Sequence, residues 1–414
     1  MAEADTGYRD GGDDVRTCPV RQPTARPPPG ARPTKETMFL ALREMRRAKA
    51  RFGLLMAAVA LLVFLILVQQ ALQASLITSF VGALERQSAP VLVFSVDGQR
   101  AIQGSVISPE LERAVVEVPE VAESGRIGQG TFTIEVDGGG DASSDGSEAA
   151  IIGYESEDLG APEELSEGRL SEDPGEAVGS AGDFAVGDTV QVVGAGSEGP
   201  ELTVVGLAED AQIQVSPTLF VAWPDYEAAA LADNPDAATI PPSVLGVRPV
   251  DGVTDEELTD RVNAADDEAD ALTRAEAAEE APGVGEVRMS FQVIFLLFAL
   301  VVPLVSGLFF LIVTFQKSRS LTLLRAVGAS GGVLVRSLLV QVVLVVGGGL
   351  AIGTALYALL TLVEVGTLTL RFDIGAVAVW SALLLGLGLI SALVSARQVL
   401  AIDPVEATTG GGVR

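Results

Sequence analysis

The chain has 414 residues, a formal net charge of −28 and a mean hydropathy of +0.40. It contains no histidine and one cysteine, Cys18, which excludes histidine acid–base catalysis, a histidine or multi-cysteine metal site and an intrachain disulfide. The acidity has the wrong sign for binding the phosphates of nucleic acid, so no nucleic-acid partner is expected.

The N-terminal part divides into two segments before the first apolar stretch. Residues 1–33 are rich in proline, arginine, aspartate and glycine, which predicts a disordered cytoplasmic leader. Residues 34–51 place apolar side chains at helical spacing with arginines on the other side. We expect an amphipathic juxtamembrane helix on the inner membrane surface; a solvated helix that only sets the topology is the alternative.

Four apolar stretches each reach the ~20 residues that a ~30 Å hydrocarbon core requires. They comprise residues 52–84, 291–315, 334–363 and 374–400. The first begins too far from the N-terminus for a cleaved signal peptide, so we expect a retained span. It continues past Gln69, Gln70 and Gln73 without a helix breaker until Gly82, which predicts a helix that rises beyond the membrane as a stalk. Glutamines that simply mark the membrane boundary are the alternative interpretation.

Charge is distributed unevenly between the spans. Residues 85–286 hold 44 of the 55 carboxylates, and residues 85–290 hold nine arginines and no lysine. Basic residues lie instead before the first span, after the second and after the fourth. The positive-inside bias predicts that both termini are cytoplasmic and that residues 85–288 form a large domain outside the plasma membrane. The acidity of this domain is expected to serve solubility, since its clusters lack the spacing of a calcium-binding loop.

The outer domain shows mixed patterns that predict an α+β fold. Strands are expected in residues 89–108, 125–138, 150–154, 184–208 and 218–222, and a flexible loop in residues 137–147. Residues 108–121 predict a helix capped by Ser108, with Leu111, Val115 and Val116 facing inward. Further helices are expected at 223–232 and over the whole of 254–283, where capping residues occur without β-branched runs.

Motifs for catalysis are missing from the sequence. No P-loop occurs, because no lysine follows the glycines at 328–332 at the required spacing; these glycines predict a turn between two helices. The spans carry no ionisable residue at mid-depth, which disfavours ion-coupled transport. We therefore expect no catalytic residue, no metal and no cofactor, and an ATP-driven function would need an ATPase on another chain.

Two segments of the membrane region are candidate functional sites. Residues 317–335 are short, basic and amphipathic, and they connect the second and third spans on the cytoplasmic side, where an external motor could push. Glycines in the third span, at Gly347, Gly348, Gly349 and Gly353, predict close helix approach. That approach is either a contact within one protomer or a dimer interface, and the sequence does not decide between them.

Two runs of residues resemble the FtsX-like permeases, which include the MacB and LolC/LolE type ABC exporters. The family pattern LLRAxGAS matches Leu323, Leu324, Arg325, Ala326, Gly328, Ala329 and Ser330, and the pattern AxxxxPxEAL is similar to Ala396, Arg397, Asp403, Pro404, Val405, Glu406 and Ala407. The order of one span, a large outer domain and three spans also agrees, and residues 184–208 resemble the small β lobe of that domain. The likeness covers residues 34–408, although Gly331 and Gly332 stand where the family often has basic residues.

The resemblance implies a non-catalytic permease subunit of an ABC transporter. Residues 289–400 would be the FtsX-like domain, residues 85–288 a MacB-like domain and residues 401–414 a cytoplasmic tail. Two such chains, identical or different, would pair with two ATPase subunits and transmit work to a substrate or partner protein outside the membrane. The ATPase would dock on a coupling helix that contains Ser320, Leu321, Leu323, Leu324, Arg325, Gly328 and Ala329.

Two other functions are weighed against the permease. A membrane-anchored sensor or scaffold would bind a ligand with its outer domain, but a sensor would ordinarily add a cytoplasmic signalling domain. An integral membrane enzyme is disfavoured because the sequence has no histidine and no pair of carboxylates within the membrane.

Overall fold

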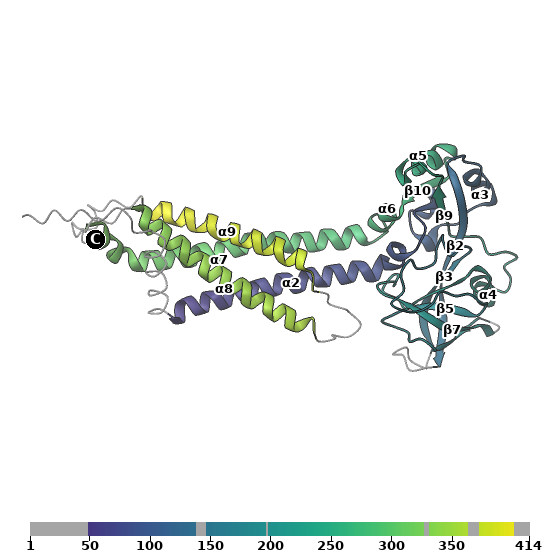
Figure 1. The fold of residues 1–414 in the computed structure, drawn as a ribbon, viewed down its shortest axis with the longest axis horizontal. Coiled ribbons are helices and arrows are strands. Elements are labelled where there is room, and N and C mark those ends of the chain that lie inside the picture. The colour runs from purple at the N-terminus through teal and green to yellow at the C-terminus, as the bar shows by residue number, and fades with distance from the viewer. Residues whose placement is uncertain (1–48, 138–145, 196–197, 327–330, 363–371, 401–414) are drawn as a thin grey trace, which may run out of the picture.

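A computed structural model describes residues 49–137, 146–195, 198–326, 331–362 and 372–400 of the chain. The molecule is elongated, with four long helices at one end and a mixed α/β domain at the other (Figure 1). The helices are α2 (Lys49–Arg86), α7 (Val284–Ala326), α8 (Gly331–Leu360) and α9 (Ile374–Leu400). Each is long and apolar enough to cross a membrane, in agreement with the four spans expected from the sequence.

The predicted ends of the spans agree with the helices to different degrees. Helix α9 has the expected bounds, and α8 begins three residues before the expected residue 334. Helix α7 is much longer than the apolar stretch 291–315, because it extends into polar sequence at both ends. The leader, nearly all of the expected juxtamembrane helix, residues 138–145 of the expected loop and the C-terminal tail lie outside the described residues.

Helix α2 confirms the predicted stalk. It continues without interruption past Gln73 to Arg86, so its 38 residues span about 57 Å at a rise of 1.5 Å per residue. The helix enters the outer domain, where Val81, Ala83 and Leu84 are buried. Helix α2 therefore runs without a break from the membrane bundle into the core of the outer domain.

The outer domain lies between α2 and α7 in the chain and is built on one mixed sheet. Its strands are β1 (Val91–Ser95), β2 (Val121–Asp137), β3 (Ser147–Tyr154), β4 (Glu167–Gly168), β5 (Glu176–Ser180), β6 (Thr189–Val193), β7 (Glu198–Ala208), β8 (Thr218–Ala222), β9 (Val244–Pro249) and β10 (Ala269–Thr273). They run in the order β10-β1-β9-β2-β3-β8-β5-β7-β4, and β6 pairs with β2 and β7. This mixed sheet agrees with the predicted α+β class.

Strand β2 divides the domain into two lobes because its first half pairs with β9 and its second half pairs with β3 and β6. One part, which we call the upper lobe, packs α3 (Pro109–Val116) and α5 (Asp255–Ala265) on β1, β9 and β10. The other part, which we call the β-lobe, packs α4 (Trp223–Asp233) on β3, β5, β6, β7 and β8. Two short 3-10 turns, η1 (Val96–Gly98) and η2 (Ile102–Gly104), follow β1, and α6 (Arg274–Glu279) follows β10.

Several local predictions hold in the outer domain. The β unit expected at residues 184–208 is the antiparallel pair β6–β7, with Thr189 opposite Thr203. The expected strand at 218–222 is β8. Ser108 caps α3 by accepting a hydrogen bond of 3.1 Å from the Leu111 backbone N–H.

The predicted inward face of α3 was partly wrong. Leu111 and Val115 are buried, as expected, but Val116 is 53% exposed. Leu111 and Val115 are four residues apart and lie on one face of the helix. Val116 is the next residue and points about 100° away around the helix axis, which turns it out of the core.

The continuous helical character predicted for residues 254–283 was also wrong. Helices α5 and α6 both begin with capping boxes, at Thr254 and Thr273, but strand β10 lies between them. Its sequence, ADALT, contains few residues that favour strands. Pairing with β1, where Leu92 lies opposite Leu272, determines the strand, and this long-range contact has no local signal in the sequence.

Candidate functional site at the junction of the membrane helices and the outer domain

The predicted coupling segment begins as the end of α7. Ser320, Leu321, Leu323, Leu324 and Arg325 lie in its last two turns, so the structure shows a continuation of α7 here and no separate helix. Gly328 and Ala329 fall in residues 327–330, outside the described residues, and α8 begins at Gly331. This end of α7 is the one farthest from the outer domain (Figure 1).

Three of the four glycines singled out in α8 face α2. A Cβ atom at Gly353 would lie 2.6 Å from the Ala60 carbonyl oxygen, and one at Gly349 would lie 2.6 Å from the Val59 side chain. A Cβ at Gly348 would meet the side chain of Met56 at 2.8 Å. Contact within the protomer therefore accounts for these three glycines. A Cβ atom built at Gly347 would have no other atom within 4 Å, so a subunit contact at Gly347 stays a prediction.

The outer end of the bundle shares a hydrophobic core with the outer domain. Val81 and Leu84 of α2 and Val284 at the start of α7 belong to the same buried cluster as Phe94 and Phe220 of the sheet. Buried apolar contacts of this kind stabilise by about 25 cal/mol per Å² removed from water. Both membrane helices that adjoin the domain are therefore seated in its core rather than connected by flexible segments.

Arginine side chains reinforce this seating. All nine arginines of residues 85–290 lie within 4.0 Å of a carboxylate, and four of these arginines form five ion pairs at the junction. The four junction arginines are Arg86, Arg100, Arg274 and Arg288. No sequence motif marks these four arginines; the available signal is the rarity of arginine in a region that holds 44 carboxylates.

Arg274 joins three separate parts of the junction. Its Nη1 donates to the Gln87 carbonyl oxygen, directly after α2, at 2.7 Å and to Glu163 Oε2 at 2.6 Å. The residue itself begins α6, which leads into α7. One guanidinium thus connects the end of α2 with the segment that precedes α7.

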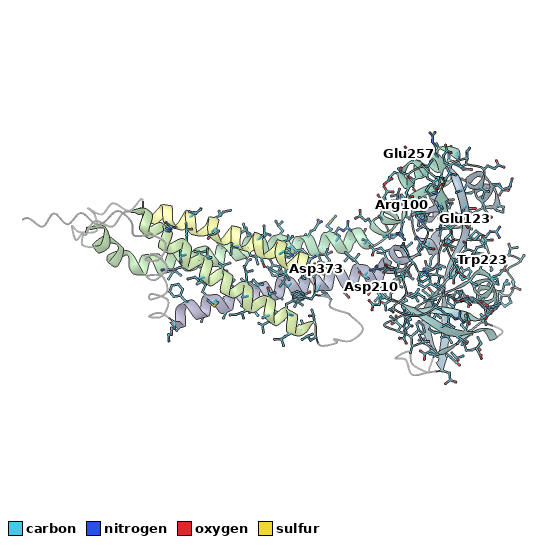
Figure 2. All side chains as sticks on the ribbon, viewed as in Figure 1. Arg100, Glu123, Asp210, Trp223, Glu257 and Asp373 are labelled. Atoms are coloured by element: carbon cyan, nitrogen blue, oxygen red, sulfur yellow. The ribbon has the colours of Figure 1, made fainter. Side chains whose placement is uncertain are left out.

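Arg100 forms the corresponding contact on the upper lobe. Its Nε donates to Asp270 Oδ2 in β10 at 2.8 Å, and it also pairs with Glu280, at the end of α6. The hydrogen bond to Asp270 raises the pKa of Arg100 above its ordinary value, with the nearby carboxylate charges acting in the same direction. Figure 2 shows Arg100 on the side of the domain that faces the helices.

A cavity of about 420 Å³ lies between the bundle and the β-lobe. One face of α2, from Leu67 to Ser79, forms one wall, and residues 180–182 and 209–212 of the β-lobe form another. Tyr357 of α8 and Asp373 and Ala376 at the start of α9 complete it. Both walls carry a carboxylate, Asp373 beside α9 on the bundle side and Asp210 on the β-lobe side (Figure 2).

Metal binding has no support among the described residues, because no group of three or more His, Cys, Asp or Glu side chains converges within them. The cavity at the junction has a size that accommodates a small molecule.

No protein-family model matches the sequence, and no curated protein matches it either. Two solved structures are similar to part of the chain. The periplasmic region of MacB from Actinobacillus actinomycetemcomitans is 12% identical with a TM-score of 0.31, and the match covers 46% of this chain and 91% of that one. The extracellular domain of the noncanonic ABC-type transporter YknZ from Gram-positive bacteria is 11% identical with a TM-score of 0.29, and the match covers 44% of this chain and 99% of that one.

Proposed function

We propose that this chain is the membrane-spanning permease subunit of an ABC transporter, which couples ATP hydrolysis on a separate ATPase subunit to work outside the membrane. The observation that carries the proposal is that α2 and α7 are continuous from the membrane bundle into the core of the outer domain. The LLRAxGAS-like run at the far end of α7 supplies the expected attachment point for the ATPase.

The proposed mechanism uses the stiffness of these helices. An α-helix whose backbone hydrogen bonds are intact moves as a rod, so displacement at one end is delivered at the other. Helix α7 has 43 residues and spans about 65 Å, but Pro303 near its middle has no backbone N–H and removes one hydrogen bond of the helix. Helix α2 contains no proline and is therefore the stiffer of the two. Because α7 begins in the hydrophobic core shared with α2, closure of the ATPases would reorient the outer domain rather than bend a linker.

We expect the working unit to contain two permease chains, identical or different, and two ATPase subunits. The exposed apolar face of α7, which includes Leu296, Leu300 and Leu304, is available to lipid or to a second chain. Both termini would be cytoplasmic, with the outer domain beyond the plasma membrane. The substrate would be a lipophilic compound, a peptide or a lipoprotein, unless the work is done on a partner protein such as a cell-wall enzyme.

A ligand-binding sensor or scaffold is the second candidate function, and the cavity at the junction favours it. Its volume of about 420 Å³ falls within the range of ~300–1,000 Å³ that small-molecule sites occupy. A ligand there would contact α2, the β-lobe and the outer ends of α8 and α9 together. Binding could then change how the domain sits on the bundle without any ATPase.

Co-purification with the product of a neighbouring ATPase gene tests the proposed function. We expect Arg325→Glu and Leu324→Asp each to weaken the complex about ten-fold or more, because a docked helix would lose a charge contact or bury a carboxylate. Membrane insertion should be unchanged. Arg113→Glu, on the exposed surface of α3, is the matched charge reversal and should leave the complex intact. Full association of both variants would refute docking at this segment.

A further inference from the structure

The loop between β7 and β8 is bonded directly to the backbone of α2. Three backbone hydrogen bonds join them: Ala83 N–H donates to the Gln212 oxygen (2.9 Å), Gln214 N–H to the Phe80 oxygen (3.0 Å) and Val215 N–H to the Ser79 oxygen (2.8 Å). Helix interiors ordinarily satisfy these groups within the helix. The loop therefore holds α2 by its main chain, at the level where the helix enters the domain.

This contact requires a glycine in α2. A Cβ atom at Gly82 would lie 2.0 Å from the Asp210 carbonyl oxygen, which is far inside any allowed contact. The Asp210 side chain also forms an ion pair with Arg86, one helical turn further along, at 3.4 Å. The loop and the helix thus approach as closely as two backbones can, and only at this turn of α2 does the sequence provide a glycine between Gly53 and the end of the helix.

Backbone strain is concentrated in the same loop. Asp210, Gln214 and Val215 all have positive φ, at 56°, 53° and 61°. This left-handed conformation is unfavourable for residues with a Cβ and most unfavourable for a β-branched residue such as Val215. The Val215 side chain is 48% exposed, so its packing does not compensate for the strain. Residues 213–216 close into a turn through a hydrogen bond from the Ser216 N–H to the Ile213 oxygen (3.0 Å), and the hydrogen bonds to α2 add to this turn.

The other side of the loop is fixed to the β-lobe. Gln212 Nε2 donates to Asp183 Oδ2 at 2.7 Å, and Ile213 N–H donates to Thr218 Oγ1 at 3.0 Å. Residues 209–212 also form one wall of the cavity of about 420 Å³ between the bundle and the β-lobe. Movement of the loop on the α2 side would therefore take place beside open space, while its β-lobe side stays attached.

We propose that residues 209–216 are a strained latch with two positions, one engaged on α2 at Gly82 and one released. In the engaged position, the β-lobe and α2 move as one body. Release allows Gln214 and Val215 to adopt negative φ and frees the Ser79 and Phe80 carbonyl groups of α2, while α2 stays seated in the core that it shares with the sheet. The contacts described above are those of the engaged position, and the use of the latch in transmitting ATP-driven motion rests on the proposed function.

Amide hydrogen exchange of the full-length chain in lipid nanodiscs tests the latch, with the Gln214 amide as the reporter. Val215→Gly removes the energetic cost of the left-handed conformation, and the greater backbone freedom of glycine offsets part of this gain. The engaged position should therefore become more populated, and exchange at the Gln214 amide should slow about five-fold. Gly82→Ala should release the loop and speed exchange at least about ten-fold, because the added methyl group cannot fit. The matched control is Gln99→Gly, at another positive φ of 50° away from α2, which should leave Gln214 unchanged.

An unchanged or faster exchange rate at Gln214 in Val215→Gly would overturn the latch, even if Gly82→Ala failed to fold. The measurement needs no ATPase. Failure to recover an ATPase partner would therefore refute the proposed function without altering this result, and a negative exchange result would leave the permease assignment standing.

Discussion

Helices α2 and α7 differ from α8 and α9 in where they end. The first pair extends beyond the membrane bundle to the outer domain, whereas α8 and α9 stop short of it (Figure 1). The outer ends of α2 and α7 share a hydrophobic core with the sheet and are surrounded by arginine ion pairs. The comparison indicates two structural roles: α2 and α7 connect the bundle to the domain, whereas α8 and α9 pack within the bundle.

The largest expected effect comes from placing a charge at the end of each kind of helix. Leu84→Asp would bury an unpaired carboxylate in the core shared by α2 and the domain, since Leu84 is 4% exposed, and should destabilise the domain by about 3 kcal/mol or more. Leu362→Asp, just after α8 at 81% exposure, should leave the domain unaffected. Thermal unfolding of the domain in detergent is the measurement. Equal effects of the two substitutions would contradict the division between the helix pairs.

An intermediate effect is expected where the pairs meet, at the packing of α8 on α2. Gly353→Leu would drive a side chain into Ala60 and Val63, and overpacking of this kind costs about 1–3 kcal/mol. Gly347→Leu is the matched control because a Cβ there meets nothing within 4 Å. The melting temperature of the purified chain should fall for Gly353→Leu only. If Gly347→Leu instead disrupts a dimer, as size-exclusion chromatography would detect, the predicted subunit interface gains support at that residue.

The smallest effect concerns a contact remote from the junction, between β5 and the segment before it. Arg169 hydrogen-bonds Glu176 and, with the Glu172 and Asp173 backbone amides, lowers the pKa of Glu176 to about 2. Because the pKa is lower in the folded state, this carboxyl group stabilises the folded state at pH values above its ordinary pKa of 4.5. That stabilisation is lost as the pH falls towards 2. The stability difference between the wild type and Glu176→Gln should therefore shrink as the pH falls from 5 to 2, as measured by urea unfolding. A difference that stays constant over this range would show that the ion pair does not contribute.

The membrane part of the fold could be predicted from the sequence because its physical signal is local. A run of some 20 apolar residues identifies a span wherever it packs, and α9 has the predicted bounds for this reason. The stalk was also predictable, since no helix breaker occurs between Gly53 and Gly82. In the outer domain, β8 and the cap of α3 carry comparable local signals.

Contacts between distant segments could not be predicted from the sequence. The sequence of β10 predicts a helix, and the strand is explained only by its pairing with β1. Nothing in the sequence indicates that Arg274 hydrogen-bonds to the Gln87 carbonyl oxygen. The hydrogen bonds between α2 and residues 212–215 join main-chain groups, so they do not require particular side chains that a sequence could reveal. The exception is Gly82, where the close approach requires a glycine. The glycines of α8 marked a close contact correctly, but only the structure shows that α2 is the partner of three of them.

The most direct test of the proposed transmission is the distance between the two outer domains of a permease–ATPase complex. A single spin label at Val186, which is 44% exposed on the β-lobe, can be introduced in a Cys18→Ser chain so that no other cysteine reacts. Pulsed dipolar spectroscopy should show that the distance distribution between the labels shifts when ATP is bound, and that Arg325→Glu abolishes the shift. Full ATP turnover with an unchanged distribution would contradict the coupling of α2 and α7 to the outer domain.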